Sequence, residues 1–185
     1  METCNWPGNN PLMIEYHDTE WGVPVHNDKK HFEFLVLDAF QAGLSWAIVL
    51  NKREGFRRAF VQYNISEIAA FGEDKVQELL KDTGIIRNQL KVRAAVNNAQ
   101  RFMEIQKEFG SFDKYIWQFT GFKTKVNKWT SLSQIPATSD ESDAMSKDLK
   151  QRGFKFVGST ICYAYMQAAG MVNDHMENCF RYKQV

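Results

Sequence analysis

Hydrophobic side chains recur at helical spacing along most of the chain, and no alternating pattern is long enough for a useful strand. Residues 1–27 and 121–139 lack this spacing and are predicted to be irregular. The predicted helices begin at Asn27 or Asp28, after Gly43, near residues 66 and 73, after Gly84, at Ser111, at Ser139 or Asp140, and at Ser159. The expected class is therefore all-α.

Length and composition suit one globular domain spanning residues 1–185. The chain has 185 residues, of which 44% are hydrophobic, and its 3 cysteines are too few for a small disulfide framework. No apolar stretch approaches the ~20 residues of a membrane helix, and the N-terminus has neither a basic start nor an apolar core. We expect a soluble cytoplasmic protein with no membrane association.

The charge balance argues against binding nucleic acid through charge alone. Lys and Arg number 23 and Asp and Glu number 22, which leaves a net charge of +1. Nucleic-acid-binding domains usually carry a basic excess or patch. If this chain binds DNA, it must do so with few cations and through geometry.

Two thiols and two imidazoles lie near the ends of the chain, in the segments 1–27 and 171–185. Cys4 and His17 are in the first segment, and His175 and Cys179 in the second. His175 and Cys179 are four residues apart, so on a helix they would share one face. Such a set suits a structural Zn²⁺ that ties the two ends together, although spacing alone also permits four unrelated residues.

The remaining metal-type residues fit ordinary structural roles. His26 and His31 lie beside charged residues and are expected at the surface. Cys162 lies within an apolar helical pattern and is expected to be a small buried side chain.

A helix, a short turn bounded by Gly153 and Gly158, and a second helix are predicted over residues 140–170. Glycines let a backbone approach a phosphate, and the start of the second helix presents free N–H groups to it. Lys155 adds a positive charge in the turn. The segment therefore fits a helix-hairpin-helix that binds DNA backbone, or a plain pair of packed helices.

Asp38 interrupts an apolar helix, and aromatic residues surround that helix in the sequence. A carboxylate among apolar neighbours is unfavourable unless it has a partner or a ligand. Trp46, with Trp6, Tyr16 and Trp21 upstream, could form a pocket for a flat, positively charged ring. Alternatively, Asp38 faces solvent and the aromatic residues belong to the core.

At this point the motifs resemble the bacterial family of DNA-3-methyladenine glycosylase I, within the helix-hairpin-helix DNA glycosylase superfamily. The resemblance covers nearly the whole chain. It rests on Cys4-x-Trp6, Tyr16-His17-Asp18-x-Glu20-Trp21-Gly22-Val23-Pro24, Gln41-Ala42-Gly43-Leu44-Ser45-Trp46, Lys52-Arg53-Glu54, Gly84-Ile85-Ile86-Arg87, Arg152-Gly153-Phe154-Lys155-Phe156-Val157-Gly158-x-Thr160-Ile161-Cys162-Tyr163, Met166-Gln167-Ala168 and Val172-Asn173-Asp174-His175-x-x-x-Cys179.

The resemblance implies the superfamily's all-α glycosylase fold, with one structural Zn²⁺ joining the N- and C-terminal segments. It also implies roles for particular residues. The four metal ligands would be Cys4, His17, His175 and Cys179; the base would contact Tyr16, Asp38 and Trp46, with Trp6 and Trp21 lining the pocket; and DNA would contact Gly43, Leu44, Gly153, Lys155 and Gly158.

Two acidic positions need comment. The family usually has Glu at the position of Asp38, so this chain keeps the charge on a side chain one methylene shorter. The family lacks the superfamily's catalytic Asp downstream of the hairpin. Asp174 lies in that region, and it is expected to orient His175 or to cap a last helix.

The implied activity is base excision repair. The enzyme would flip 3-methyladenine out of double-stranded DNA and hydrolyse its N-glycosidic bond. Two alternatives stay open: a non-catalytic, zinc-stabilised helix-hairpin-helix module that binds DNA, and a glycosylase for a broader range of alkylated bases. Nothing in the sequence requires a dimer, so a monomer is expected.

Overall fold

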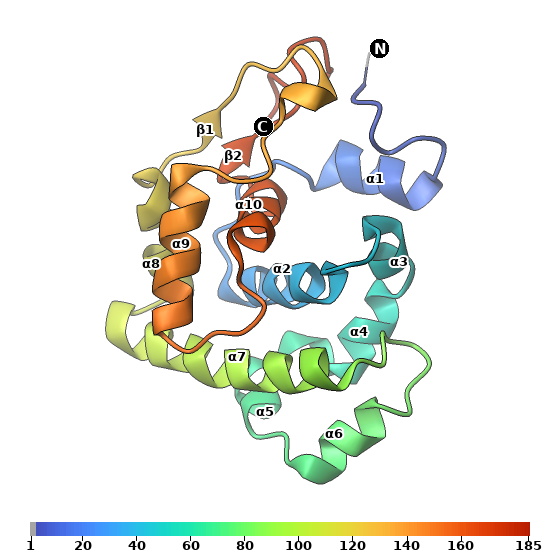
Figure 1. Cartoon of the computed structure of the whole chain (residues 1–185), viewed down its shortest axis with the longest axis vertical. Helices are drawn as coiled ribbons and strands as arrows, with labels where there is room; N and C mark the ends of the chain where they lie inside the picture. The colour runs from blue at the N-terminus through green and yellow to red at the C-terminus, as the bar shows by residue number, and fades with distance from the viewer. Residues whose placement is uncertain (1–2) are drawn as a thin grey trace.

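Helix α2 runs through the centre of the computed structural model, which describes residues 3–185 (Figure 1). Helices α3, α7, α8 and α10 pack against it. In chain order the elements are α1 (Pro11–Thr19), α2 (Asp28–Gln41), α3 (Trp46–Asn51), α4 (Arg53–Ala59), η1 (Val61–Tyr63), α5 (Ile65–Ala69), α6 (Glu73–Leu79), α7 (Gln89–Phe109), α8 (Phe112–Ile116), η2 (Trp117–Thr120), β1 (Lys125–Val126), η3 (Leu132–Gln134), α9 (Asp140–Gln151), α10 (Ser159–Ala168) and β2 (Val172–Asn173).

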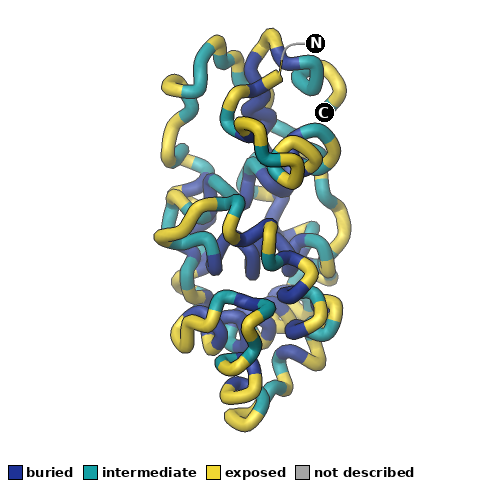
Figure 2. Tube along the Cα trace, turned by 90° about the vertical axis from the view of Figure 1, so that its right-hand side faces the viewer, coloured by how far each residue is buried: buried dark blue, intermediate teal, exposed yellow. Residues whose placement is uncertain are grey.

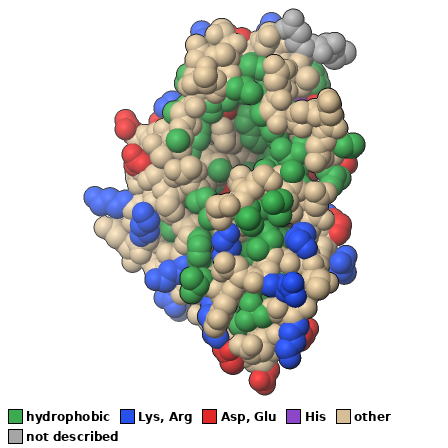
Figure 3. Space-filling view, turned by 45° about the vertical axis from the view of Figure 1, so that its right-hand side comes forward, with side chains coloured by type: hydrophobic (Ala, Val, Ile, Leu, Met, Phe, Trp, Pro, Cys, Tyr) green, Lys and Arg blue, Asp and Glu red, His purple; other side chains and the backbone are tan. Residues whose placement is uncertain are grey.

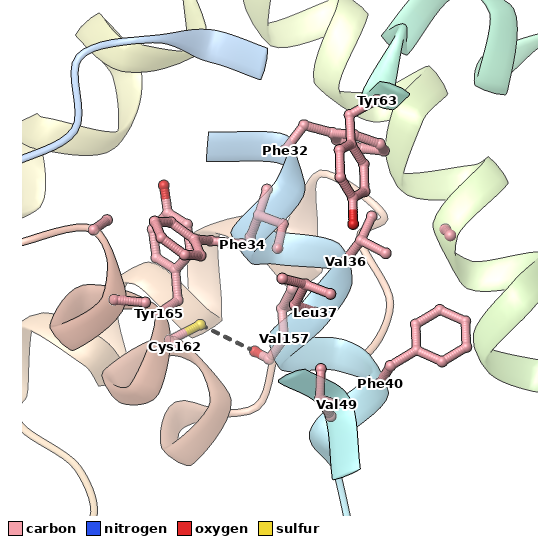
Figure 4. Close-up of a cluster of buried hydrophobic side chains, with 14 of the residues drawn as sticks. Phe32, Phe34, Val36, Leu37, Phe40, Val49, Tyr63, Val157, Cys162 and Tyr165 are labelled. Carbon is pink, nitrogen blue, oxygen red and sulfur yellow. Dashed lines mark hydrogen bonds between the residues drawn. The ribbon is translucent and has the colours of Figure 1, made fainter. Parts of the chain in front are cut away.

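From His31 to Phe40, helix α2 is buried on all sides, and most of these residues are apolar. Asn27 caps its start by accepting a hydrogen bond from the backbone N–H of Lys30 at 3.0 Å. Its side chains interleave with Val49 of α3, Tyr63 of η1 and neighbours on α10 (Figure 4). Buried residues gather in the middle of the molecule, and exposed ones lie at its outside (Figure 2). Polar side chains between His31 and Phe40, such as Glu33 and Asp38, are therefore held inside the molecule.

Helix α7 packs against α2 on one side and against α5 and α6 on the other (Figure 1). Asn88 caps its first turn, and Gly110 ends it in a left-handed conformation with φ of 84°. Helical spacing in the sequence predicts Leu90, Ala94, Ala95 and Phe102 on the buried face of this helix. Ala94, Ala95 and Phe102 are buried, but Leu90 is 70% exposed, so the prediction is wrong for Leu90.

Helices α9 and α10 form the predicted pair joined by a short turn. Ser139 caps α9 in a reciprocal arrangement with Ser142. The turn begins at Gly153, whose φ is 86°. The side chain of Asn98, on α7, braces the turn: it accepts from the backbone N–H of Lys155 at 2.8 Å and donates to the carbonyl of Lys155 at 2.9 Å.

The prediction that residues 1–27 are irregular is wrong, because α1 occupies Pro11–Thr19. The signal was short but present in the sequence. Asn10 accepts hydrogen bonds from the backbone N–H groups of Leu12 and Met13, and Pro11 occupies the first helical position.

The predicted loop 121–139 contains a very short strand. Its β1 pairs in parallel with β2, with Lys125 opposite Val172 and Val126 opposite Asn173. Only two residues of each strand pair, so within residues 3–185 the fold remains essentially helical. None of the described helices is long and apolar enough to cross a membrane.

Segment 20–25 docks onto the end of α10. Gly22 donates to the carbonyl of Gln167 and Val25 to that of Ala169, each at 3.0 Å. Gly170 follows with φ of 66°, and a Cβ atom there would lie 2.3 Å from the carbonyl carbon of Val23. Only glycine permits this close approach.

The structure contradicts the expectation of surface exposure for His31, and it confirms the expectations for His26 and Cys162. His31 is fully buried, with Nε2 3.0 Å from Asp113 and Nδ1 2.6 Å from the hydroxyl of Tyr165. Both partners lie far from His31 along the chain, so its sequence neighbours do not reveal its burial. The side chain of His26 is 62% exposed, and Cys162 is buried as expected.

Candidate functional site

A pocket of about 370 Å³ opens between α1, α2, α3 and α10. The sequence-predicted residues Trp6, Tyr16, Trp21, Asp38 and Trp46 all line it. Figure 3 shows a recess lined by hydrophobic side chains, with several Lys and Arg side chains on the part of this face below it. The structure thus brings together residues from α1 and the segments on either side of it, from α2, and from the start of α3.

The aromatic rings meet mostly edge to face, which leaves faces free to contact a ligand. The ring centroids of Trp6 and Trp21 are 5.0 Å apart at 67°. Those of Tyr16 and Trp46 are 5.2 Å apart at 55°. Trp46 is the first residue of α3, so the turn after α2 sets its position.

Asp38 is only 2% exposed, which excludes the alternative in which it faces solvent. Its Oδ2 atom finds no hydrogen-bond partner within residues 3–185, and burial raises its pKa well above the ordinary value. The indole N–H groups of Trp6 and Trp46 are also buried without partners in that range. Buried polar groups of this kind are unfavourable unless a ligand pairs with them.

A buried ion-pair network fixes the segment that carries Tyr16 and Trp21. Arg53 donates to Glu33 at 2.8 Å and to Glu20 at 2.7 Å, and Lys30 donates to both carboxylates. Burial raises the pKa of Glu20, but the hydrogen bonds and charges of Arg53 and Lys30 outweigh that effect and lower it to about 2. The network joins the end of α1 to α2 and α4.

Cys4, His17, His175 and Cys179 converge as predicted, with their ligand atoms within 4.8 Å of one another and all four residues buried. His175 Nδ1 lies 3.8 Å from the thiol of Cys4 and 3.6 Å from that of Cys179. His17 Nε2 lies 3.6 Å from Cys179. Tetrahedral Zn²⁺ with ordinary bond lengths requires S···N separations of roughly 3.6 Å.

The other ring nitrogens of both histidines already have partners. His17 Nδ1 is 2.6 Å from Asp18, and His175 Nε2 is 2.9 Å from the carbonyl of Trp21. Such contacts orient metal-binding imidazoles. The donor set therefore fits a structural Zn²⁺. The prediction that His175 and Cys179 share a helix face is wrong, because they lie in turns after β2.

Asp174 does neither job expected of it. The Trp21 carbonyl, not Asp174, contacts the His175 ring, and no helix follows Asp174 within the described part of the chain. Instead, the buried carboxylate accepts four hydrogen bonds. The donors are Asn127, Trp129, Tyr163 and Gln167, at 2.7–2.8 Å.

The residues predicted to contact DNA lie outside the pocket lining. Gly43 has φ of 76°, Leu44 is 38% exposed, and both lie in the turn between α2 and α3. Lys91 supports this turn, because its buried ammonium donates to the carbonyls of Phe40 and Ala42 at 2.8 and 2.6 Å.

The hairpin residues are accessible as well. Lys155 is exposed, and a Cβ at Gly158 would meet no atom within 4 Å. Gly158 directly precedes α10, whose first N–H groups have no side-chain cap.

The family model described as methyladenine glycosylase matches residues 6–182. The chain belongs to the methyladenine glycosylase family. DNA-3-methyladenine glycosylase 1 of Escherichia coli K12 is 47% identical over 182 residues, covering 98% of this chain and 97% of the relative. A crystal structure of 3-methyladenine DNA glycosylase I shares 46% identity with a TM-score of 0.95, covering 97% of this chain and 98% of that one.

A further family structure bears on the ligand. It is a Tyr-to-Phe variant of 3-methyladenine DNA glycosylase I in complex with 3-methyladenine, and it is 32% identical with a TM-score of 0.94, covering 97% of each chain. The helical architecture predicted from the sequence is thus the one that methyladenine glycosylases adopt.

Two residues that line the pocket, Gln41 and Gln167, lie within the family motifs of the sequence, but no role was predicted for them. Gln41 follows Asp38 by three residues on α2, and Gln167 follows Ala164 by three residues on α10. Residues three apart share a helix face. That spacing from Asp38 was a signal for Gln41, whereas no local signal marks Gln167.

Proposed function

We propose that this chain is a DNA glycosylase that hydrolyses the N-glycosidic bond of 3-methyladenine in double-stranded DNA. It releases the free base and leaves an abasic site. One observation carries the proposal: Asp38 is buried in an aromatic pocket of about 370 Å³, and its Oδ2 atom has no hydrogen-bond partner among residues 3–185. The names of the relatives and the 3-methyladenine complex of one of them support it.

The pocket suits a flat, positively charged base. Methylation at N3 of adenine in DNA gives the base a positive charge, and aromatic faces attract cations. Tyr16 and Trp46 contact the base, and Trp6 and Trp21 complete the walls. Burial favours the protonated form of Asp38 in the free protein. A cationic base beside it favours the carboxylate, so binding gains an ion pair.

Capture and positioning then carry most of the catalysis. The positive charge makes the base a good leaving group, so the glycosidic bond needs little further activation. Flipping the base out of the duplex is required for access, and damaged bases are easier to unstack. Asp38 is the proposed catalytic residue, because its charge stabilises the base as the bond breaks.

DNA is held by geometry rather than by net charge. Leu44, exposed beside Gly43, acts as an apolar wedge in the base stack. Gly153, Lys155 and Gly158 form the helix-hairpin-helix contact with the DNA backbone. The free N–H groups at the start of α10 suit a phosphate.

A structural Zn²⁺ joins the chain ends through Cys4, His17, His175 and Cys179. All four protein ligands are present, so no position is left for water or substrate, and the ion stabilises rather than catalyses. Metal analysis of protein purified without chelator is expected to give about one zinc per chain. Substantially less than that would argue against the site.

The test of the activity is release of free base from alkylated DNA. We expect release of 3-methyladenine by the wild-type protein and its loss on Asp38→Ala with helical content intact. Binding of DNA without any release, even at high enzyme concentration, would favour the non-catalytic module. Comparable release of 7-methylguanine would favour the broader glycosylase.

Three further features remain predictions of the sequence. They are a single domain over residues 1–185, a monomeric state and a cytoplasmic location.

A further inference from the structure

Gln167 lines the pocket, and its amide is held in one orientation. Its Nε2 atom donates to Oδ2 of Asp174 at 2.8 Å. An amide side chain can present either its N–H₂ group or its oxygen to a ligand, depending on how it is rotated. The partner at Asp174 decides which atom remains for the pocket.

Asp174 can only act as an acceptor here. It is 1% exposed, and its Oδ1 accepts from the indole N–H of Trp129 and the amide of Asn127, both at 2.7 Å. Its Oδ2 also accepts from the hydroxyl of Tyr163 at 2.8 Å. With all its contacts satisfied by donors, this carboxylate requires the nitrogen of Gln167, because two facing oxygens would repel.

The oxygen of Gln167 is therefore the amide atom left for a ligand. No group within residues 3–185 donates a hydrogen bond to it. In the described part of the chain, Oδ2 of Asp38 is a second unpaired acceptor in the same lining, and the N–H groups of Trp6 and Trp46 are unpaired donors. The pocket thus offers acceptors on two helices, α2 and α10.

We infer that Oε1 of Gln167 accepts a hydrogen bond from the exocyclic amine of the bound base, and that Asp174 is the positioning residue that fixes this acceptor. The inference rests on the proposed function and specifies how that site selects its base. A base that carries a carbonyl oxygen in place of the amine would set oxygen against oxygen. Gln167 therefore selects 6-amino purines over 6-oxo purines.

The test compares two free bases on the full chain. 3-Methyladenine carries an amine where 3-methylhypoxanthine carries a carbonyl oxygen. Wild type is expected to bind 3-methyladenine more tightly. Gln167→Met keeps the side-chain length but removes the amide, and we expect it to lower the ratio of the two affinities about tenfold, the size of one lost hydrogen bond. A merely structural role would weaken both bases alike and leave the ratio unchanged.

A matched control is Gln106→Met. Gln106 also donates to a carboxylate, that of Asp28, at 2.7 Å, but it does not line the pocket. It should lose similar stability and keep the wild-type ratio. Asp174→Asn frees the Gln167 amide to rotate, so this variant alone should lower the ratio of the two base affinities. Combined with Gln167→Met, it should lower that ratio no further. Because Asp174 precedes His175, zinc content is measured in each variant.

An unchanged affinity ratio in folded Gln167→Met would overturn the inference while leaving the glycosylase proposal intact. If wild type neither binds 3-methyladenine nor releases it from alkylated DNA, the proposed function fails and the inference fails with it. A lowered ratio in Gln167→Met, with the ratio of Gln106→Met unchanged, supports the inference.

Discussion

Gly170 lets segment 20–25 close against the end of α10, and replacing it with alanine should loosen that contact. A Cβ at position 170 would lie 2.3 Å from the carbonyl carbon of Val23 and 2.4 Å from the nitrogen of Pro24. Backbone atoms cannot rotate away as a side chain can. Segment 20–25 would have to move, which strains the hydrogen bonds that Gly22 and Val25 make to α10.

The expected loss has two parts that can be separated. Alanine in the left-handed region lowers the free energy of unfolding by about 1–2 kcal/mol. About 0.4–1 kcal/mol of this is regained, because alanine restricts the unfolded chain more than glycine does. Overpacking against a backbone adds about 1–3 kcal/mol. Gly121 has nearly the same φ, 63° against 66°, but its Cβ would meet no atom within 4 Å. Gly121→Ala therefore measures the first part alone.

Chemical denaturation of both variants gives the difference directly. We expect Gly121→Ala to lower the free energy of unfolding by about 1 kcal/mol and Gly170→Ala by about 2–4 kcal/mol. Gly170→Ala should also release 3-methyladenine more slowly, because Trp21 and Gln167 lie on the two sides of this contact. Equal losses of stability in the two variants would refute the packing argument.

Three other substitutions test the pocket and its support. Asp38→Asn should abolish base release yet stabilise the protein at neutral pH. Burial holds the pKa of Asp38 above its ordinary 3.8, so the folded wild type binds the proton more tightly than the unfolded chain. The stability of the wild type therefore falls as pH rises above 3.8. Unfolding measured at a series of pH values should show a smaller fall in the variant. Lys91→Met leaves two main-chain carbonyls at the end of α2 without their donor, which should loosen the turn that carries Leu44. Excision from duplex DNA should therefore fall while binding of the free base stays near wild type. Equal losses in both assays would contradict the role of Lys91 in supporting Leu44. Arg53→Met leaves Glu20 and Glu33 without their arginine partner, so that they share Lys30, and it should cost about 3 kcal/mol in denaturation. A loss below about 0.5 kcal/mol would mean that Arg53 contributes little to the network.

The sequence predicted most helices well where local signals were strong. Asn27 and Ser139, each one of two predicted starts, cap α2 and α9. The errors came where the signal was brief or depended on distant neighbours. The Asn10–Pro11 start of α1 is only two residues long, and the burial of His31 follows from contacts with residues more than 80 positions away.

The chemistry of the site followed from residue types and motifs, but its arrangement did not. Motifs identified Asp38, the four aromatic pocket residues and the four metal-type ligands. They did not identify Gln167 as a lining residue or the carboxylate that orients it.

By itself, the amino-acid sequence determined the helical class, the starts of most helices, and the presence of a lone acid among aromatic and apolar residues. These depend on spacing and capping within a few residues, which are local interactions. Only the tertiary structure decided three features of the site. Asp38 is buried, and its Oδ2 atom has no hydrogen-bond partner within residues 3–185; the two ends of the chain bring their thiols and imidazoles together; and the amide nitrogen of Gln167 donates to Asp174. Burial, charge pairing and hydrogen-bond direction depend on segments far apart in the chain, and packing alone brings those segments into contact.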